Sequence, residues 1–384
     1  MKGRGRSLGY ACLALAFAAL FALAAHALKT RARGGSEGRA EVAPEGLRIG
    51  APIAIENLTL FPLFNRDQTD PGPMTTLAEA TAKGLAEVRE LGSSPGAEEQ
   101  TSAERPVENR RHGRHGFARQ AGATVNTLEI VNNGDTPIYV LAGTVVKGGN
   151  QDRQIGQDFV VGAKSRVPVD AFCVEHGRWR GDREGADTQG KFVPVEQLAS
   201  SKVRAAGQHE SNQSEVWAEV AKVNSANGKQ AASGTLLATL DDATLKAQRS
   251  ELAKRIDAAL AKADPEEELV GMAYAVDGRV RGVRWFASTA LFGLFRGTLV
   301  NTAASDAITA RGGAAAKPAP PMAAADVSSF LREVEAAKSE EKATPADNVN
   351  RYKKAKVGYG SSTEYRPKAG SKKAVPLSSD YVAK

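Results

Sequence analysis

Apolar residues recur at every second position in RVPVDAFCVE, the stretch that begins at Arg166. Such alternation is typical of a β-strand with one buried face. The residues on that face are Val167, Val169, Ala171, Cys173 and Glu175. The acidic side chain at the end of this row needs a partner, because an unpaired buried charge costs several kcal/mol.

Similar short apolar runs surround this strand. TVNTLEIVN and PIYVLAGTVV are separated by NGDT, while QDFVV and RVPVDAFCVE are separated by GAKS. Short strands joined by tight turns predict a β-sandwich or a strongly curved antiparallel sheet. Further along, Asp277-Gly278 separates ELVGMAYAV from RVRGVRWF, which predicts a hairpin.

Helical patterns lie before and after the strands. TTLAEATAKG predicts a short helix capped by Thr75 or Thr76, and Asn212 with Glu215 predicts the start of a longer helix. Three later segments also have helical patterns: the stripe Leu245, Leu252, Ile256 and Leu260 that Pro265 ends, the apolar TALFGLFRGTLVNTAASDAI, and the stripe Val327, Phe330, Leu331 and Val334. The predicted fold class is α+β, with an antiparallel β-sandwich-like N-terminal half packed with a mixed α+β C-terminal half.

Composition divides the chain into segments. We expect an export signal or anchor over 1–27, a linker over 28–44, a β-rich half over 45–235 with a surface insertion at 92–118, a helix, a β-hairpin and a buried helix over 236–310, a Pro/Ala linker over 311–325, and a helix with closing strands over 326–384. Composition alone favours a basic tail at the very end.

The first 27 residues combine a cationic start, an apolar run and Ala25-His26-Ala27, which is typical of an export signal cleaved after Ala27. The alternative is an uncleaved membrane anchor, because the run is nearly long enough to span a bilayer. Cleavage would remove Cys12 and leave Cys173 without an intramolecular disulfide partner. We therefore expect an extracytoplasmic protein, periplasmic or secreted, that contacts the membrane only if the segment stays uncleaved.

The formal net charge is +7, but the basic residues are spread along the chain, so no specific nucleic-acid binding is predicted. The sequence contains no P-loop, no Gly-x-Ser-x-Gly elbow and no dinucleotide fingerprint. Its histidines lack the spacing of a zinc site. We accordingly predict neither a metal nor a cofactor.

Several motifs occur in the order and spacing of one family. VNNGDTPIYVLAGTVVKGGNQDR, VPVDAFCVEHGRW and NQSEVWAEV together resemble the ARG-and-rhodanese-phosphatase-superfamily-associated protein domain. IENLTLFPL, MTTLAEATAKGLAEV, VGMAYAVDGRVRGVRWFAS and GYGSSTEYR also resemble their family counterparts. The resemblance covers nearly everything after residue 45, and it implies closing strands at the C-terminus in place of a tail.

The family has no settled activity, and its name implies an association with ADP-ribosylglycohydrolases and phosphatase-like proteins. Where its usual pattern is Gly-Ala-Lys-Gln-Asn-Arg, this chain has Gly148-Gly149-Asn150-Gln151-Asp152-Arg153. The lysine is absent, and an acid replaces an amide.

The candidate site lies in these motifs. Glu175 is either a general base or ligand anchor, or one half of a salt-bridged clasp with Arg153 or Arg178. Gly148 and Gly149 form either an anion-binding backbone nest or an ordinary turn. Cys173 is read as a buried inert thiol, with a nucleophile activated by His176 as the alternative.

We therefore predict a site with Glu175 as its catalytic candidate and six ligand-binding candidates, which are Gly148, Gly149, Gln151, Arg153, Arg178 and Trp179. The favoured function is the binding or processing of a small anionic ligand that resembles a nucleotide or ADP-ribose. The alternative is a non-catalytic structural or protein-interaction module with a partner protein in the cell envelope. Whether the chain is an enzyme is left open.

Overall fold

The hairpin expected at Asp277-Gly278 is confirmed in the computed structural model, where both residues have positive φ, 52° and 72°. It joins β16 (Leu269–Val276) to β17 (Arg279–Phe286). The structure describes residues 41–42, 46–91, 127–183, 185–263, 268–315, 317–342, 344, 348–367 and 374–384. The chain divides into two compact units, 1–41 and 42–384, and the two-residue strand β1 (Glu41–Val42) spans their boundary.

This hairpin belongs to a large antiparallel sheet. Its other strands are β2 (Arg48–Ile49), β3 (Ile53–Ile55), β4 (Leu58–Phe64), β18 (Ser339–Lys342), β19 (Asn348–Lys354), β20 (Gly358–Tyr365) and β21 (Val375–Ala383). From β2 the order is β2-β4-β16-β17-β21-β20-β19-β18, with β3 beside β4. The closing strands implied by the family resemblance are therefore present. The strands over 48–64, expected in the N-terminal half, instead pair with the late hairpin.

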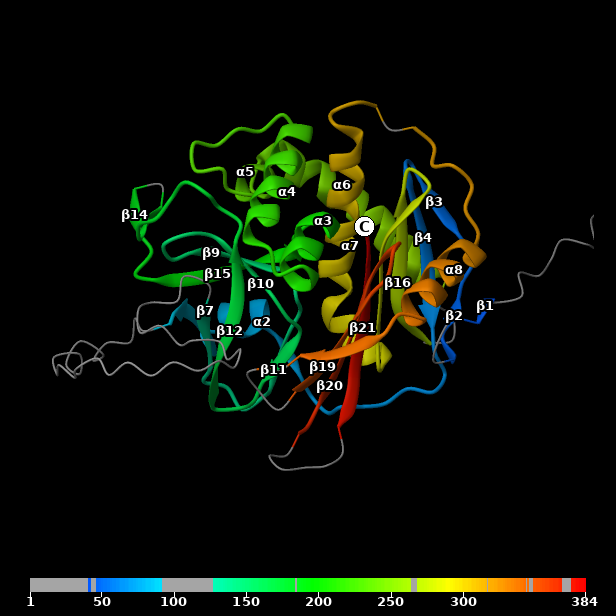
Figure 1. Cartoon of the computed structure of the whole chain (residues 1–384), viewed down its shortest axis with the longest axis horizontal. Helices are drawn as coiled ribbons and strands as arrows, with labels where there is room; N and C mark the ends of the chain where they lie inside the picture. The colour runs from blue at the N-terminus through cyan, green and yellow to red at the C-terminus, as the bar shows by residue number, and fades with distance from the viewer. Residues whose placement is uncertain are drawn as a thin grey trace, which may run out of the picture. The chain divides into compact units, whose positions relative to one another are not determined.

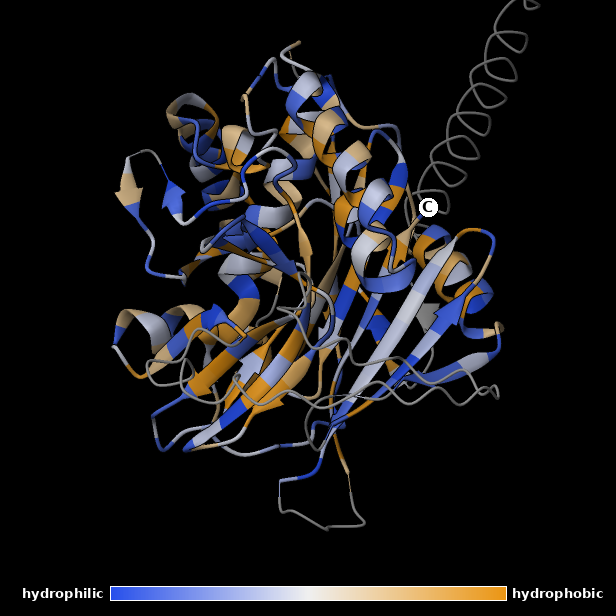
Figure 2. Ribbon diagram, turned by 60° about the vertical axis from the view of Figure 1, so that its left-hand side comes forward, coloured by the Kyte–Doolittle hydropathy of each residue, from blue (hydrophilic) through white to orange (hydrophobic). Residues whose placement is uncertain are grey.

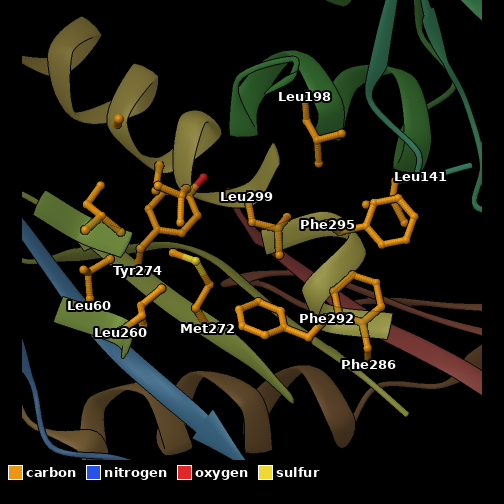
Figure 3. Close-up of a cluster of buried hydrophobic side chains, with 14 of the residues drawn as sticks. Leu60, Leu141, Leu198, Leu260, Met272, Tyr274, Phe286, Phe292, Phe295 and Leu299 are labelled. Atoms are coloured by element: carbon orange, nitrogen blue, oxygen red, sulfur yellow. The ribbon is translucent and has the colours of Figure 1, made fainter. Parts of the chain in front are cut away.

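Helices cover both faces of the large sheet. The helices α6 (Ala243–Ala263) and α7 (Thr289–Arg311) pack on one face, and α8 (Ala324–Glu335) packs on the other. Figure 3 shows the first of these cores, where the rings of Phe286 and Phe295 stack with centroids 5.4 Å apart. All four residues of the stripe predicted for α8 are buried. The three later helices are confirmed, and their apolar residues share cores with the sheet. Figure 2 shows apolar and polar positions interspersed along the helical ribbons.

The β-rich part closes into a six-stranded barrel. Its strands are β6 (Ala86–Glu90), β7 (Thr127–Asn132), β9 (Thr144–Gly148), β10 (Arg153–Ile155), β12 (Ser165–Cys173) and β15 (Lys191–Leu198). The order around the barrel is β10-β12-β7-β6-β15-β9, and neighbouring strands are antiparallel. The α+β class with mostly antiparallel sheets is confirmed, but this region forms a barrel in place of the expected sandwich.

The barrel replaces the sandwich because two expected tight turns lead from one sheet to another. A separate sheet contains β5 (Thr75–Thr76), β8 (Ile138–Val140) and β11 (Phe159–Val161), in the order β11-β8-β5. NGDT connects β7 to β8, and GAKS connects β11 to β12. The Asn132 side chain donates hydrogen bonds to the carbonyls of Thr136 and Gly162, 2.9 and 3.0 Å away, and so ties the two turns together.

Short helices pack beside the barrel. They are α2 (Leu77–Ala82), α3 (Ser201–Arg204), the π-helical turn η3 (Ala205–His209), α4 (Gln213–Ala226) and α5 (Leu237–Leu240). Two expected caps are confirmed, because the side chains of Thr76 and Asn212 accept hydrogen bonds from the N–H groups of Glu79 and Glu215. Val145 and Val174 of the barrel region pack in one core with residues of α3, α4 and α5. A two-stranded ribbon, β13 (Asp182–Arg183) with β14 (Ala186–Asp187), lies nearby in sequence.

A buried ionic network joins two strands of the large sheet to α3 and to the connection between β10 and β11, and α7 contacts both β15 and β16 (Figure 1). Arg284 of β17 reaches both Asp158 and Asp380, with nitrogen–oxygen distances of 3.1 and 2.8 Å. Arg204 of α3 reaches the same Asp380 oxygen at 2.9 Å. The four side chains form the junction network, in which two guanidinium groups balance two carboxylates and all four residues are almost fully buried.

Three expectations lie wholly or partly outside the described residues: the export signal or anchor over 1–27, most of the linker over 28–44, and the insertion over 92–118. Pro265, expected to end α6, also lies outside them. None of the described helices has the length and apolar character needed to cross a membrane.

Candidate functional site

Strand ends from around the barrel meet at one end of it, which we call the mouth. Glu90, Gly148 and Cys173 end β6, β9 and β12, while Arg153 and Lys191 begin β10 and β15. Because neighbouring strands are antiparallel, these strand ends lie at the same end of the barrel. The β10–β12 register, for example, pairs Arg153 with Cys173. The candidate residues predicted from sequence therefore gather around one end of the barrel.

Glu175 and Arg178 form the predicted salt bridge. Both are buried, and the Nη2 atom of Arg178 lies 2.8 Å from the Oε2 atom of Glu175. The same guanidinium donates to the carbonyls of Gly148 and Gly149 at 3.0 and 2.7 Å. The pair thus fastens the segment after β12 to the turn after β9, and we call it the clasp.

Asp152 is the second acid of the clasp. Its backbone N–H donates to Glu175 at 3.0 Å, and its side chain accepts from Thr235 at 2.7 Å. Arg178 and Arg183 lie 3.5 and 3.6 Å from its carboxylate oxygens. The acid that replaces the family's amide is therefore fully enclosed and has several partners.

The two glycines have their N–H groups bound inside the protein. Gly148 donates to the Asp152 carboxylate at 3.0 Å, and Gly149 donates to the Lys191 carbonyl at 2.9 Å. Their φ values are +135° and +45°, and an added Cβ at Gly148 would lie 2.2 Å from the Lys191 carbonyl oxygen. The anion that the Gly148 N–H group binds is thus the Asp152 carboxylate of the same chain.

Arg153 does not reach Glu175. Its side chain is fully buried, and Nη1 donates to the backbone and side-chain oxygens of Gln151 at 3.0 and 3.3 Å. Its ion-pair partner is Glu90, whose Oε1 atom lies 3.8 Å from the Nη2 atom of Arg153. Nε and Nη2 have no hydrogen-bond acceptor among the described residues. Arg153 is therefore a buried cation with an incomplete set of partners.

Trp179 lies next to this cation. The guanidinium carbon of Arg153 is 5.9 Å from the centroid of the indole ring. Although tryptophan is usually buried, Trp179 is 57 % exposed. An aromatic surface and an incompletely paired cation are therefore adjacent at the mouth.

The nucleophile alternative for Cys173 finds no support in the geometry. The thiol is buried, and burial raises its pKa above the ordinary value. The ring of His176 packs against Trp217, with centroids 4.5 Å apart. In the part of the chain that the structure describes, no three metal-binding side chains cluster together.

The two buried acids have pKa values shifted in opposite directions. Burial raises the pKa of Glu175, but hydrogen bonds from Arg178, the Asp152 N–H and Ser233 outweigh it and bring the pKa below its ordinary value. Burial and the nearby Glu175 charge raise the pKa of Asp152. Glu175 therefore stays ionised and hydrogen-bonded, which suits a structural anion better than a proton acceptor.

Sequence reasoning missed three participants at the mouth: Glu90, Arg183 and Thr235. Glu90 ends a strand and belongs to no motif. Thr235 lies in a loop more than eighty positions from Asp152, to which its hydroxyl donates a hydrogen bond. Asp152 itself carried a signal, because it departs from the family pattern.

Comparisons with known proteins place nearly all of the described chain in one family. Neither the curated proteins nor the solved structures contain a match to this chain. The model of one family matches residues 46–379, which include the barrel, the mouth and nearly all of the large sheet. The chain therefore belongs to the family described as the ARG and Rhodanese-Phosphatase-superfamily-associated Protein domain.

Proposed function

We propose that this chain binds a small anionic ligand of the nucleotide or ADP-ribose type, and that Arg153 receives its negative charge. The observation that carries the proposal is the fully buried guanidinium with two nitrogens that lack acceptors among the described residues. Buried polar groups nearly always have partners, and a buried cation without them is costly. A phosphate or carboxylate bound at the mouth would supply two acceptors in the geometry that a guanidinium prefers.

Trp179 supports the nucleotide part of the proposal. Its exposed ring, beside the guanidinium, offers a surface on which a base can stack. Because Arg153 itself is fully buried, binding requires a local movement that exposes its guanidinium group. Through Arg178, the clasp anchors one side of the segment that carries Trp179.

The clasp favours a second candidate, a non-catalytic structural or protein-interaction module of the cell envelope. Glu175 and Arg178 bind each other and nearby backbone groups, so they need no ligand to satisfy their charges. The ligand-binding role proposed for Arg178 and the catalytic role proposed for Glu175 remain predictions. We assign either activity to an extracytoplasmic location, on the export pattern of residues 1–27.

A thermal-shift screen tests the binding proposal, with inorganic phosphate, AMP, ADP-ribose and ribose 5-phosphate as probes. We expect at least one probe to raise the melting temperature, and its affinity to fall about tenfold or more in Arg153→Gln. Arg166→Gln is the matched control, because Arg166 is exposed on the barrel strand β12. A nucleotide, but not phosphate, should also bind more weakly to Trp179→Ala.

Two results would count against the proposal. The first is a flat response to every probe in the panel. The second is a shift of equal size in Arg153→Gln and in the wild-type protein, which would move the anion site elsewhere.

A further inference from the structure

The large sheet has a hollow of about 400 Å³ on the face that carries α8. The helix buries Phe330, Leu331 and Val334 against the sheet and ends at Glu335, which lines the hollow. Beyond that point no described helix covers the lining strands β17, β19, β20 and β21 on this face. The volume lies within the range of small-molecule sites.

The floor of the hollow is one row of residues across four strands. The register pairs Trp285 with Ser379, Ser379 with Ser362, and Ser362 with Arg351. Residues that lie opposite each other in a sheet share a face, so this row places two hydroxyl groups between an indole and a guanidinium. All four residues line the hollow.

The hydroxyls at the centre are available to a ligand. Ser379 is only 5 % exposed, and its Oγ atom has no hydrogen-bond partner among the described residues. The Oγ atom of Ser362 likewise has none in the described part of the chain. Each hydroxyl can donate one hydrogen bond and accept two.

Four of the five charged residues that line the hollow are already paired with each other, and the fifth, Asp67, is exposed at its rim. Arg351 binds Glu364 at 2.7 Å, and Lys353 binds Glu335. Glu335 also accepts a hydrogen bond from the Tyr381 hydroxyl at 2.6 Å. A charged ligand would leave one of these pairs unbalanced, whereas a neutral ligand would meet donors and acceptors without disturbing the charge balance.

An aromatic pair forms one side. The rings of Trp285 and Tyr381 stack with centroids 5.1 Å apart and planes inclined by 16°. Both rings belong to the core beneath α8, and Trp285 keeps 5 % of its surface exposed where it lines the hollow. We propose that this hollow, on the α8 face of the large sheet, binds a neutral carbohydrate, whose hydroxyls meet Ser362 and Ser379 while its apolar side lies beside the exposed part of Trp285. The site is separate from the mouth and does not depend on the anion proposal.

The test is calorimetric titration of the full chain with glucose, galactose, N-acetylglucosamine, ribose, maltose and cellobiose, up to about 20 mM. We expect at least one sugar to bind, and its affinity to fall about tenfold in Ser379→Val, which removes a hydroxyl and fills the floor. Ser362→Ala removes a hydroxyl without adding volume, so it tests the site even if the valine variant fails to fold. Ser250→Val, at an exposed position in α6, is the matched control and should bind as the wild-type protein does.

A second readout places the sugar. The chain has three tryptophans, so Trp179→Phe with Trp217→Phe leaves Trp285 as the only source of indole fluorescence. A sugar that binds in the hollow should change that fluorescence along the calorimetric curve. No binding by any sugar, equal binding to Ser379→Val and Ser362→Ala, or binding without a fluorescence change would each overturn the proposal.

Discussion

Two buried ionic networks in this protein, the junction network and the mouth, differ in how completely their arginines are paired. At the junction, Arg204 and Arg284 each have a carboxylate oxygen within 2.9 Å. At the mouth, Arg178 is equally well paired, but Arg153 has its recorded carboxylate at 3.8 Å and two nitrogens without acceptors among the described residues.

The difference teaches where to look for a ligand. Each junction arginine also has an Nε atom without an acceptor in the described residues, so one unpaired nitrogen is compatible with a structural role. What distinguishes Arg153 is the lack of a close carboxylate together with a largely exposed tryptophan beside it. A network with closely matched charges holds parts of the fold together, whereas an incompletely matched one can receive a charge from outside.

The largest effect is expected at the junction, in Arg284→Met. The substitution leaves Asp158 without its guanidinium and Asp380 with only Arg204, in an almost fully buried site. We expect the free energy of unfolding in urea to fall by about 3–5 kcal/mol. Arg296→Met is the control, because the Arg296–Asp257 pair is partly exposed and should contribute about 1 kcal/mol or less. If Arg284→Met lowers the free energy of unfolding no more than Arg296→Met does, the junction network does not stabilise the fold.

A somewhat smaller loss is expected at the clasp, in Arg178→Met. This variant removes the Glu175 salt bridge and the bonds to two glycine carbonyls, at a residue that is 8 % exposed. We expect urea unfolding to show a loss of about 2–4 kcal/mol. An unchanged free energy of unfolding would mean that the clasp does not stabilise the fold.

The two regions should also respond differently to acid. Burial lowers the pKa of His209, near the junction, from 6.5 to about 3, so the unfolded chain binds the proton more readily. Stability is therefore complete above about pH 6.5 and falls as the pH drops, by about 2 kcal/mol between pH 7 and pH 5. Urea unfolding at both pH values should show this loss, and His209→Phe should remove it.

The clasp adds two opposing effects at lower pH. The lowered pKa of Glu175 makes its contribution disappear as the pH falls, whereas the raised pKa of Asp152 makes the folded state gain stability in the same direction. The two partly cancel. A pH dependence between 7 and 5 that persists in His209→Phe would show that another group titrates there.

Local features of the fold could be predicted from the sequence, because each depends on neighbouring residues. The Asp277-Gly278 hairpin, the caps at Thr76 and Asn212, and the buried face of β12 all follow from short patterns. The pairing of Glu175 with Arg178 was also predictable, since a buried acid at a strand end needs a nearby cation.

The remainder depends on contacts between distant segments. Nothing near Leu58 indicates that it lies opposite Val276, yet this pairing joins the first strands to the last sheet. Arg284 and Asp380 look like ordinary polar positions within strands, and only the folded chain brings them together. Arg153 was expected to be able to reach Glu175, but the closure of the barrel turns it towards Glu90.

The most direct test of the account is the free energy of unfolding of Arg153→Met in buffer free of phosphate and other small anions. If Arg153 is a buried cation that awaits a ligand, replacing it with an apolar side chain of similar length should leave the stability unchanged or raise it by about 1–2 kcal/mol. A loss of about 2 kcal/mol or more, similar to that expected for Arg178→Met, would show that Arg153 is already fully compensated within the protein and would contradict the account.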